Sequence, residues 1–240
     1  MIASLPMYDR EETRAAQDRL WRNFQRNFDG TAPRLTRRGN PWDHWTNSGL
    51  FLSQTCGLPY RARLHDKVTL VGTPVHDLPC AAGHYYSVIV SRSDMGPVPE
   101  EPSLAVNDPL SQSGWAAAHG FAQDQGLAYS RITETGAHVA SAKAVAEGRA
   151  DLAAIDAVTW KLIQRFEDFS SDLAVIDQTP PTPALPYITR AGAEPAPLYD
   201  ALARAIDALA PEDQDLLCLK GLTRIEKADY LAMPLPPKPF

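Results

Sequence analysis

Long hydrophobic runs are missing from this sequence. Charged residues or prolines interrupt every apolar stretch before it reaches the roughly 18 to 20 residues of a transmembrane helix. An excess of positive charge is missing too, because 23 lysines and arginines stand against 29 aspartates and glutamates, for a formal net charge of −6. Such a chain offers no broad attraction to a phosphate backbone. We therefore expect a soluble protein with no membrane insertion and no nucleic-acid partner.

Cysteine is scarce, with only Cys56, Cys80 and Cys218 among 240 residues. An odd number of cysteines in a chain of this length argues against a disulfide framework and favours reduced thiols. The first residues, from Met1 to Tyr8, lack the basic stretch and the apolar core of an export signal, and acidic residues follow at once. As the sequence stands, we expect a cytoplasmic location.

The pattern that is present is an alternation of short β-rich segments with amphipathic segments of about ten residues, which is typical of parallel strands joined by crossover helices. Strands are predicted over residues 2–7, 67–71, 85–90, 104–106, 129–132, 152–155, 173–176 and 185–189, and helices over 10–28, 114–125, 139–147, 157–166 and 198–209. The fold class is therefore α/β, with mostly parallel sheets flanked by helices.

Two segments look like domain boundaries. Residues 91–102 are rich in proline, serine and charge, and prolines 180, 181 and 183 follow Asp177 closely. We expect one lobe formed by residues 1–90 and 178–240, and a second lobe formed by 91–177. Two chain crossings would make a two-strand hinge, and a hinge between α/β lobes encloses a cleft. The proline-rich tail from Pro234 is predicted to be an extended strap.

The turn from Asn107 to Gly114 follows a predicted strand and opens a predicted helix. Unpaired amides at a helix start, next to the hydroxyls of Ser111 and Ser113, can hold anionic oxygens through hydrogen bonds and the helix dipole. Ordinary N-capping by either serine is the alternative interpretation.

Two further polar residues fall at later junctions of the same predicted sheet. His138 precedes a predicted helix, where the dipole favours a neutral ring, and Asp156 ends a strand. Asp156 either caps the next helix or receives a hydrogen bond from a ligand amine or hydroxyl. Because open α/β sheets bind ligands at the carboxyl ends of their strands, we expect these side chains to converge with the turn before Gly114.

The first lobe supplies fewer candidates. Tyr8 ends the first predicted strand, and Gln54 and Thr55 follow an apolar run just before the turn at Gly57. Tyr86 is one of several aromatic residues near strand ends that can form the wall of a ligand site or pack in the core. The complete set of predicted ligand-binding residues is Tyr8, Gln54, Thr55, Tyr86, Ser111, Gln112, Ser113, Gly114, His138 and Asp156.

Three segments together resemble a known family: residues 50–57 (Leu-Phe-Leu-Ser-Gln-Thr-Cys-Gly), residues 111–114 (Ser-Gln-Ser-Gly), and His138 with the run from Ala144 to Asp156. They are similar to the phosphate-, phosphite- and phosphonate-binding components of ABC importers, over nearly the whole chain. The resemblance implies a two-lobed fold of the type II periplasmic-binding-protein class. It also implies that the serine turn grips the anion, although Gln112 stands where the family has a threonine.

The resemblance further implies a substrate-binding protein for a small anionic ligand such as a phosphonate or phosphate, held in the interlobe cleft by hinge closure, without catalysis, cofactor or metal. An ABC permease would be its partner, and a monomer or weak dimer is expected. Family members usually carry an export signal, so a truncated start would make the protein periplasmic. A cytoplasmic relative of the same fold is the other possibility.

Two alternatives use other chemistry. An enzyme acting on a small molecule would place Cys56 or His138 in the reaction, with His84 as another possible base, but no nucleophile signature surrounds Cys56. A metal site would use His76, Cys80 and His84, which lie four residues apart as ligands on one helical face would. Prolines 74 and 79 argue against a helix there.

Overall fold

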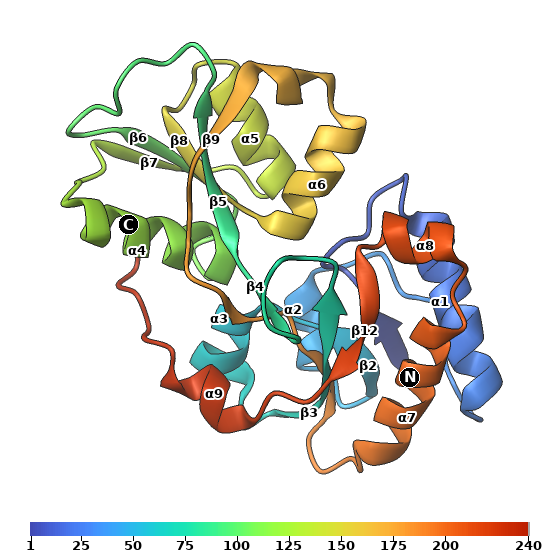
Figure 1. The fold of residues 1–240 in the computed structure, drawn as a ribbon. Coiled ribbons are helices and arrows are strands. Elements are labelled where there is room, and N and C mark those ends of the chain that lie inside the picture. Colours follow the sequence, from blue (N-terminus) through green and yellow to red (C-terminus); the bar gives the residue numbers. More distant parts are fainter. Residues whose placement is uncertain (240) are drawn as a thin grey trace. The chain divides into compact units, whose positions relative to one another are not determined.

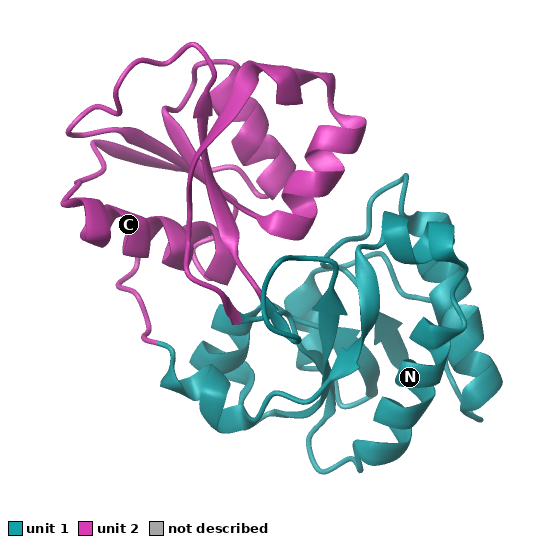
Figure 2. Ribbon diagram, viewed as in Figure 1, with its two compact units in different colours: residues 1–84, 183–233 teal, residues 85–182, 234–240 magenta. Residues whose placement is uncertain are grey.

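The computed structural model describes residues 1–239 and divides the chain into two compact units. Unit 1 comprises Met1–His84 and Pro183–Met233, and unit 2 comprises Tyr85–Thr182 and the tail from Pro234 (Figure 2). The expected boundaries near residues 90 and 178 fall inside strands of unit 2. The chain passes between the units at three points, where two were expected, because the tail returns to unit 2 after the last helix of unit 1.

Unit 1 is built on a five-stranded sheet in the order β1-β2-β11-β3-β12 (Figure 1). Its strands are β1 (Ile2–Ser4), β2 (Leu50–Gln54), β3 (Val68–His76), β11 (Tyr187–Arg190) and β12 (Leu219–Thr223). Its helices are α1 (Arg14–Asn27), α2 (Pro41–Trp45), α3 (Gly57–Pro59), the π-helical turn η1 (Tyr60–Leu64), α7 (Ala196–Asp207), α8 (Pro211–Leu216) and α9 (Lys227–Ala232).

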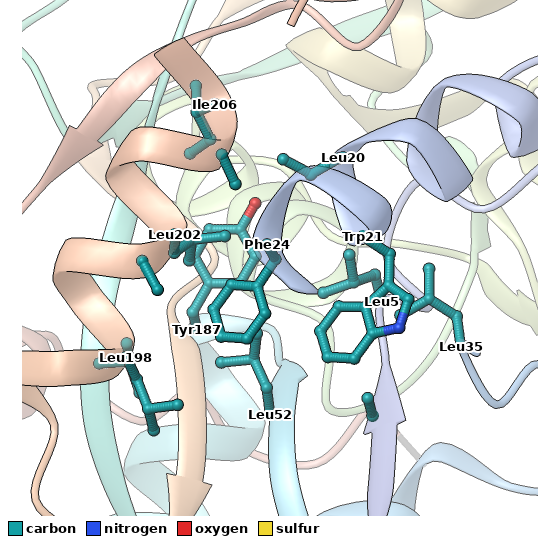
Figure 3. Close-up of a cluster of buried hydrophobic side chains, with 14 of the residues drawn as sticks. Leu5, Leu20, Trp21, Phe24, Leu35, Leu52, Tyr187, Leu198, Leu202 and Ile206 are labelled. Atoms are coloured by element: carbon teal, nitrogen blue, oxygen red, sulfur yellow. The ribbon is translucent and has the colours of Figure 1, made fainter. Parts of the chain in front are cut away.

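An aromatic core joins α1 and α7 to one face of this sheet. Trp21 and Phe24 of α1 stack with their ring centroids 5.0 Å apart, and both rings meet Phe51 of β2 edge to face. Figure 3 shows Trp21 and Phe24 among leucines of α1, α7 and β2. The opposite face is covered by α2, η1 and α9, where Tyr60 packs against Tyr230. Both faces of the sheet are therefore buried.

Unit 2 has its own five-stranded sheet in the order β7-β6-β8-β5-β9. The strands are β5 (Ser87–Arg92), β6 (Ser103–Val106), β7 (Arg131–Glu134), β8 (Leu152–Asp156) and β9 (Leu173–Gln178). The helices are the π-helical turn η2 (Gln112–Ala116), α4 (Ala117–Gln125), α5 (His138–Ala146), α6 (Ala157–Phe166) and the 3₁₀ helix η3 (Asp168–Asp172). Short strands β4 (His84–Tyr85) and β10 (Thr182–Pro183), at the junction of the units, pair with each other.

Alternate residues of the strands in unit 2 pack on opposite faces. Val88 and Val90 belong to one core with α5 and α6, whereas Ile89 between them belongs to another core with α4. Leu152 and Ala153 divide in the same way. Helices thus cover the sheet on both sides, which explains why its strands read as nearly continuous apolar runs.

The α/β class is confirmed, but the sheets are mixed rather than mostly parallel. In unit 2, β6 pairs parallel with β7 and β8, while β5 runs antiparallel to both β8 and β9. In unit 1, β1 and β2 are parallel and the other pairings are antiparallel. The expectation assumed a crossover helix before every strand, but β5 enters its sheet directly from β4, and such a strand is free to run antiparallel.

Candidate functional site

The predicted serine turn of unit 2 joins β6 to a π-helical start of α4. Ser111 is the N-cap, and its Oγ accepts a hydrogen bond of 2.9 Å from the amide of Gly114. The capping alternative is therefore confirmed for Ser111. Ser111, Gln112 and Ser113 are all buried. The first amides of a helix have no partner within the helix, so the turn collects donors at one place.

A side chain at residue 114 would meet the side chains of Asn107 and Ser111. A Cβ at residue 114 would overlap Oδ1 of Asn107 and lie 3.0 Å from Oγ of Ser111. Any larger residue must therefore displace the Asn107 side chain or the capping serine. Glycine keeps the amide of residue 114 within reach of the Ser111 hydroxyl.

His138 is the first residue of α5, and its ring meets the serine turn. Nε2 of His138 lies 2.9 Å from Oγ of Ser113 and 3.7 Å from Oδ2 of Asp156. Burial lowers the pKa of His138 below its ordinary value, while the charge of Asp156 and a backbone hydrogen bond at Ala154 oppose that shift. The imidazole is therefore neutral at pH 7, because an unperturbed histidine already titrates near pH 6.5.

Asp156 ends β8 and caps α6. Its Oδ1 accepts hydrogen bonds from the amides of Val158, at 3.0 Å, and Thr159, at 2.9 Å. Oδ2 accepts a short hydrogen bond from the Thr159 hydroxyl and faces His138. The capping interpretation is confirmed, and one carboxylate oxygen still faces the cluster. We call Ser111, Ser113, Gly114, His138 and Asp156 the polar cluster of unit 2.

The cluster does not have the geometry of a nucleophilic triad. In such a triad the serine and the carboxylate bind opposite nitrogens of the histidine, so that one orients the ring while the other loses a proton. Here Ser113 and Asp156 both lie on the Nε2 side of His138. The arrangement instead gathers hydroxyls, amides and a ring N–H or lone pair around one point, which suits binding of oxygen atoms.

The remaining prediction in unit 2, Tyr86, lies between β4 and β5. Its ring is half-buried against the core beneath α5 and α6, and its carbonyl accepts a 3.0 Å hydrogen bond from the amide of Ala157. Tyr86 thus helps to fix the start of the helix that Asp156 caps.

The candidates of unit 1 have mainly structural partners. Gln54 donates from Nε2 to the carbonyl of Leu185 at 3.1 Å, and the amide of Thr55 donates to Pro186 at 3.1 Å. Both side chains are buried. Tyr8 meets His76 edge to face, with centroids 5.5 Å apart, and both line a cavity of about 30 Å³ together with Gln54. These three residues share a region of unit 1, and their role in ligand binding stays a prediction.

Sequence reasoning missed Thr159 and Asn107. Thr159 follows Asp156 by three residues, and an N-cap aspartate with a hydroxyl residue at that spacing was a usable signal. Asn107 gave no such signal, because its contact with residue 114 arises only when the turn is folded.

The alternative chemistries find no assembled site. His76 ends β3, Cys80 lies in the following turn with its Sγ 3.2 Å from the carbonyl of His84, and His84 begins β4, so the three do not share a helical face. Within residues 1–239, no group of three potential metal-ligating side chains comes together. Cys56 is buried at the start of α3. In the same part of the chain, no helix is long and apolar enough to cross a bilayer.

Comparison with protein families identifies the class. Residues 54–232 match the model of the periplasmic substrate-binding protein of ABC phosphonate transporters. That match covers well over half of the chain, so the protein belongs to this family of ABC-transporter substrate-binding proteins. The family consists of substrate-binding transport proteins rather than enzymes, and the enzymatic alternative is not favoured.

Solved structures show the same fold. PhnD1 from Prochlorococcus marinus, in complex with methylphosphonate, superposes with a TM-score of 0.72 at 15% identity, covering 95% of this chain and 94% of that one. A binding protein component of an ABC phosphonate transporter from Pseudomonas aeruginosa (PA3383) gives 0.70 at 13% identity, covering 95% and 82%. XAC2383 from Xanthomonas citri, bound to ATP, gives 0.67 at 14%, covering 95% and 92%. No curated protein matches by sequence. The expected periplasmic-binding-protein fold is confirmed.

Proposed function

We propose that this protein binds a small phosphonate- or phosphate-like oxyanion through the polar cluster of unit 2, as the substrate-binding component of an uptake system. The observation that carries the proposal is the 2.9 Å contact between Ser113 Oγ and His138 Nε2, which joins two helix starts of one sheet. Residues 25 positions apart in sequence thus present their hydrogen-bonding groups to the same point. Family membership supplies the class of ligand.

The cluster can hold an anion without a cationic side chain. The helix starts at η2 and α5 present backbone amides with the positive end of the helix dipole. The hydroxyl of Ser111 has a proton to donate, and that of Ser113 has one when His138 Nε2–H donates to it. Hydrogen bonds to a charged group contribute roughly 1.5 to 3 kcal/mol each, so a few of them give substantial affinity.

Asp156 sets a condition on the ligand. Its buried carboxylate faces the cluster across His138, whose ring is neutral at pH 7. A fully deprotonated oxyanion would be repelled by this negative charge, whereas a ligand that carries a protonated oxygen or an amine can donate to it. We therefore propose that a singly protonated phosphonate binds better than sulfate, which has no proton to donate at neutral pH.

The other predicted residues complete the proposal. Gln112 replaces one hydroxyl of the family's serine turn with an amide, and Tyr8, Gln54, Thr55 and Tyr86 are proposed to contact the remainder of the ligand. We further propose that the partner is an ABC permease, that the protein acts as a monomer or weak dimer, and that it works in the periplasm as its family does.

Isothermal titration with methylphosphonate, phosphite, phosphate and sulfate tests the proposal. We expect saturable binding of at least one phosphorus oxyanion and weaker binding of sulfate. Ser113→Ala should weaken the binding by about 10- to 100-fold, because it removes one hydrogen bond to a charged group. Ser130→Ala is the matched control, since Ser130 is an exposed serine of the same unit.

Absence of heat and of thermal stabilisation with all four anions would contradict the proposal, because a ligand that binds only the native state must stabilise it. Equal affinities of wild type, Ser113→Ala and Ser130→Ala would show that an anion binds elsewhere.

A further inference from the structure

Strand β3 of unit 1 has one edge that is only partly paired. On one side, β11 pairs with it over Val68–Gly72, and on the other side β12 pairs with it over Thr73–His76. Within residues 1–239, no strand therefore lies along Val68–Gly72 on the side of β12. We call this stretch the free edge of β3. Such an edge presents backbone N–H and C=O groups that can pair with a further strand.

A cavity of about 390 Å³ lies along the free edge. Its walls contain every residue from Val68 to Thr73, together with Tyr60, His65, Pro195 and residues 224–227. Side chains of successive strand residues point to opposite faces of a sheet. A cavity lined by an unbroken run of strand residues therefore lies at the backbone edge that they share, rather than over one face.

The dimensions of the free edge suit a short peptide strand. Strand residues rise about 3.3 to 3.4 Å each, so Val68–Gly72 spans roughly 17 Å and can pair with a segment of about five residues. The chain's own tail is poorly suited to this place, because residues 234, 236, 237 and 239 are prolines, which have no N–H to donate. The carbonyl of Pro237 is also bonded to Trp115 in unit 2. The matching segment therefore belongs to another chain.

The charges around the cavity favour an acidic segment. Nζ of Lys227 lies 2.8 Å from Asp66, and Glu226 caps α9, so these charged groups already have partners. The guanidinium of Arg224 has no carboxylate partner within residues 1–239 and lies over the ring of Tyr199, 3.7 Å from its centroid. An aromatic ring does not neutralise this charge, so Arg224 can still bind a carboxylate through its N–H groups.

Arg224 stands at one end of the free edge. Thr223, the residue before it, pairs with Thr73 of β3. The ring of Tyr199 lies beside Gly72, where a Cβ would be only 2.9 Å from the ring atom Cδ2. The guanidinium above this ring is therefore close to the Gly72 end of the free edge. A carboxylate on Arg224 and a strand paired with the free edge can belong to one segment.

We propose that the free edge of β3 binds an extended acidic segment of another protein, which adds a strand to the sheet of unit 1 and places a carboxylate on Arg224. Main-chain hydrogen bonds to the edge supply the affinity, and Arg224 selects the acidic residue. None of the residues proposed for anion binding lines this cavity, so the two proposals are independent.

A peptide titration of the full chain tests this proposal. The probe is acetyl-Glu-Val-Thr-Val-Glu-amide, which offers a carboxylate near Arg224 in either strand direction, and amide hydrogen exchange is followed by NMR. We expect saturable binding and slower exchange at alternate amides of Val68–Gly72, because only alternate residues direct their N–H to one edge. Arg224→Gln should weaken the binding about tenfold, the loss of one hydrogen bond to a charged group. Arg190→Gln is the matched control, because Arg190 is exposed and pairs with Val68 from the opposite edge.

Two modified peptides separate strand addition from binding of a carboxylate alone. One carries N-methyl groups on its three central residues, so it keeps both glutamates but cannot form the ladder, and the other has lysine in place of each glutamate. We expect neither to bind saturably to the wild type. Equal binding of the unmodified peptide and either modified one would overturn the proposal. Slow exchange of the same amides without peptide, in a chain that sedimentation shows to be self-associated, would also overturn it and assign the edge to a second copy.

Both comparisons of peptides use the wild-type chain, so they do not depend on the folding of any variant.

Discussion

Units 1 and 2 share an architecture, a five-stranded mixed sheet covered by helices, but they fill it with different side chains. The core of unit 1 is aromatic, with Trp21, Phe24 and Phe51 in mutual contact. Beneath α5 the core of unit 2 is rich in alanine, as at Ala142 and Ala153. Bulky rings contribute much of the buried apolar area in unit 1, whereas small side chains fill much of the core beneath α5 in unit 2.

The polar candidates differ in the same way. In unit 2, Ser113, His138 and Asp156 contact one another through side chains at the starts of separate helices. In unit 1, Gln54 is bonded to backbone. Parallel strands with a helix after each one bring several helix starts to one sheet edge, and in unit 2 polar side chains stand at those starts. The polar cluster of unit 2 is therefore made of side chains at or next to helix starts, two of which, Ser111 and Asp156, are caps.

The largest expected effect comes from filling the space at Gly114. Gly114→Ala forces a Cβ onto Asn107 Oδ1, so the capping hydrogen bond of Ser111 is disrupted and the turn moves. We expect methylphosphonate affinity to fall by more than about 100-fold, the combined loss of two or more directed hydrogen bonds. Calorimetric titration measures this.

Gly120→Ala serves as the matched control in the same helical region. A Cβ at residue 120 meets nothing within 4 Å, and the residue lies inside α4. We expect unchanged affinity and a stability gain of about 0.5 to 1 kcal/mol, since alanine is the better helix former. If both alanine variants bind equally well, the turn at Gly114 is not the binding element.

The next effect separates capping from charge at Asp156. Asp156→Ala should lower the free energy of unfolding by about 0.5 to 2 kcal/mol, because the amides of Val158 and Thr159 lose their acceptor. Asp156→Asn should retain most of that stability, since asparagine caps equally well, yet it should reduce the discrimination against sulfate. Urea unfolding and competitive titration of both variants measure the two roles. Similar sulfate discrimination in wild type and Asp156→Asn would assign Asp156 to capping alone.

A smaller expected effect is a difference between the units in the pH range over which each loses stability. The pKa of His138 is lowered by burial, so the unfolded chain binds the proton more tightly than the folded one. Stability is then fully present above the ordinary histidine pKa of about 6.5 and falls as pH drops through and below it. In unit 1 the hydrogen bonds from Arg19 lower the pKa of Asp213. The stability that the Asp213 carboxylate contributes to the folded state is therefore lost only as pH falls below about 4.

Urea unfolding between pH 8 and pH 5 tests this difference. His138→Gln keeps a polar group near Ser113 but does not titrate, so its stability should change less than that of the wild type across this range. Identical pH profiles for the two proteins would show that His138 is not the group responsible.

The smallest expected effect concerns the tail. Nε1 of Trp115 donates a 2.7 Å hydrogen bond to the carbonyl of Pro237, both within unit 2. Trp115→Phe should cost the roughly 0.5 to 1.5 kcal/mol of this hydrogen bond and, because Trp115 is buried in the core of unit 2, the lost packing of the larger ring as well. Removal of residues 234–240 should cost a similar amount by urea unfolding. A truncated chain as stable as the full one would show that the tail does not stabilise unit 2.

Periodicity predicted the long elements well. The helix over 157–166 coincides with α6, and the helix predicted over 10–28 contains α1. Short elements were harder to predict. The apolar run 85–90 was expected to be one strand, but it divides into β4 and β5 around Tyr86, and β12, α8 and α9 were not predicted. Runs of three to six residues carry too few periods to distinguish a strand from a turn.

The sequence by itself determined the α/β class, the residues at the strand ends and the family to which they point, because these depend on local patterns of apolar and polar residues. Only the tertiary structure decided which of those residues meet. It placed Ser113 against His138 and assigned the Asp156 carboxylate to a helix cap. Such contacts depend on strand order and on the approach of segments far apart in the chain, which no single-sequence pattern encodes.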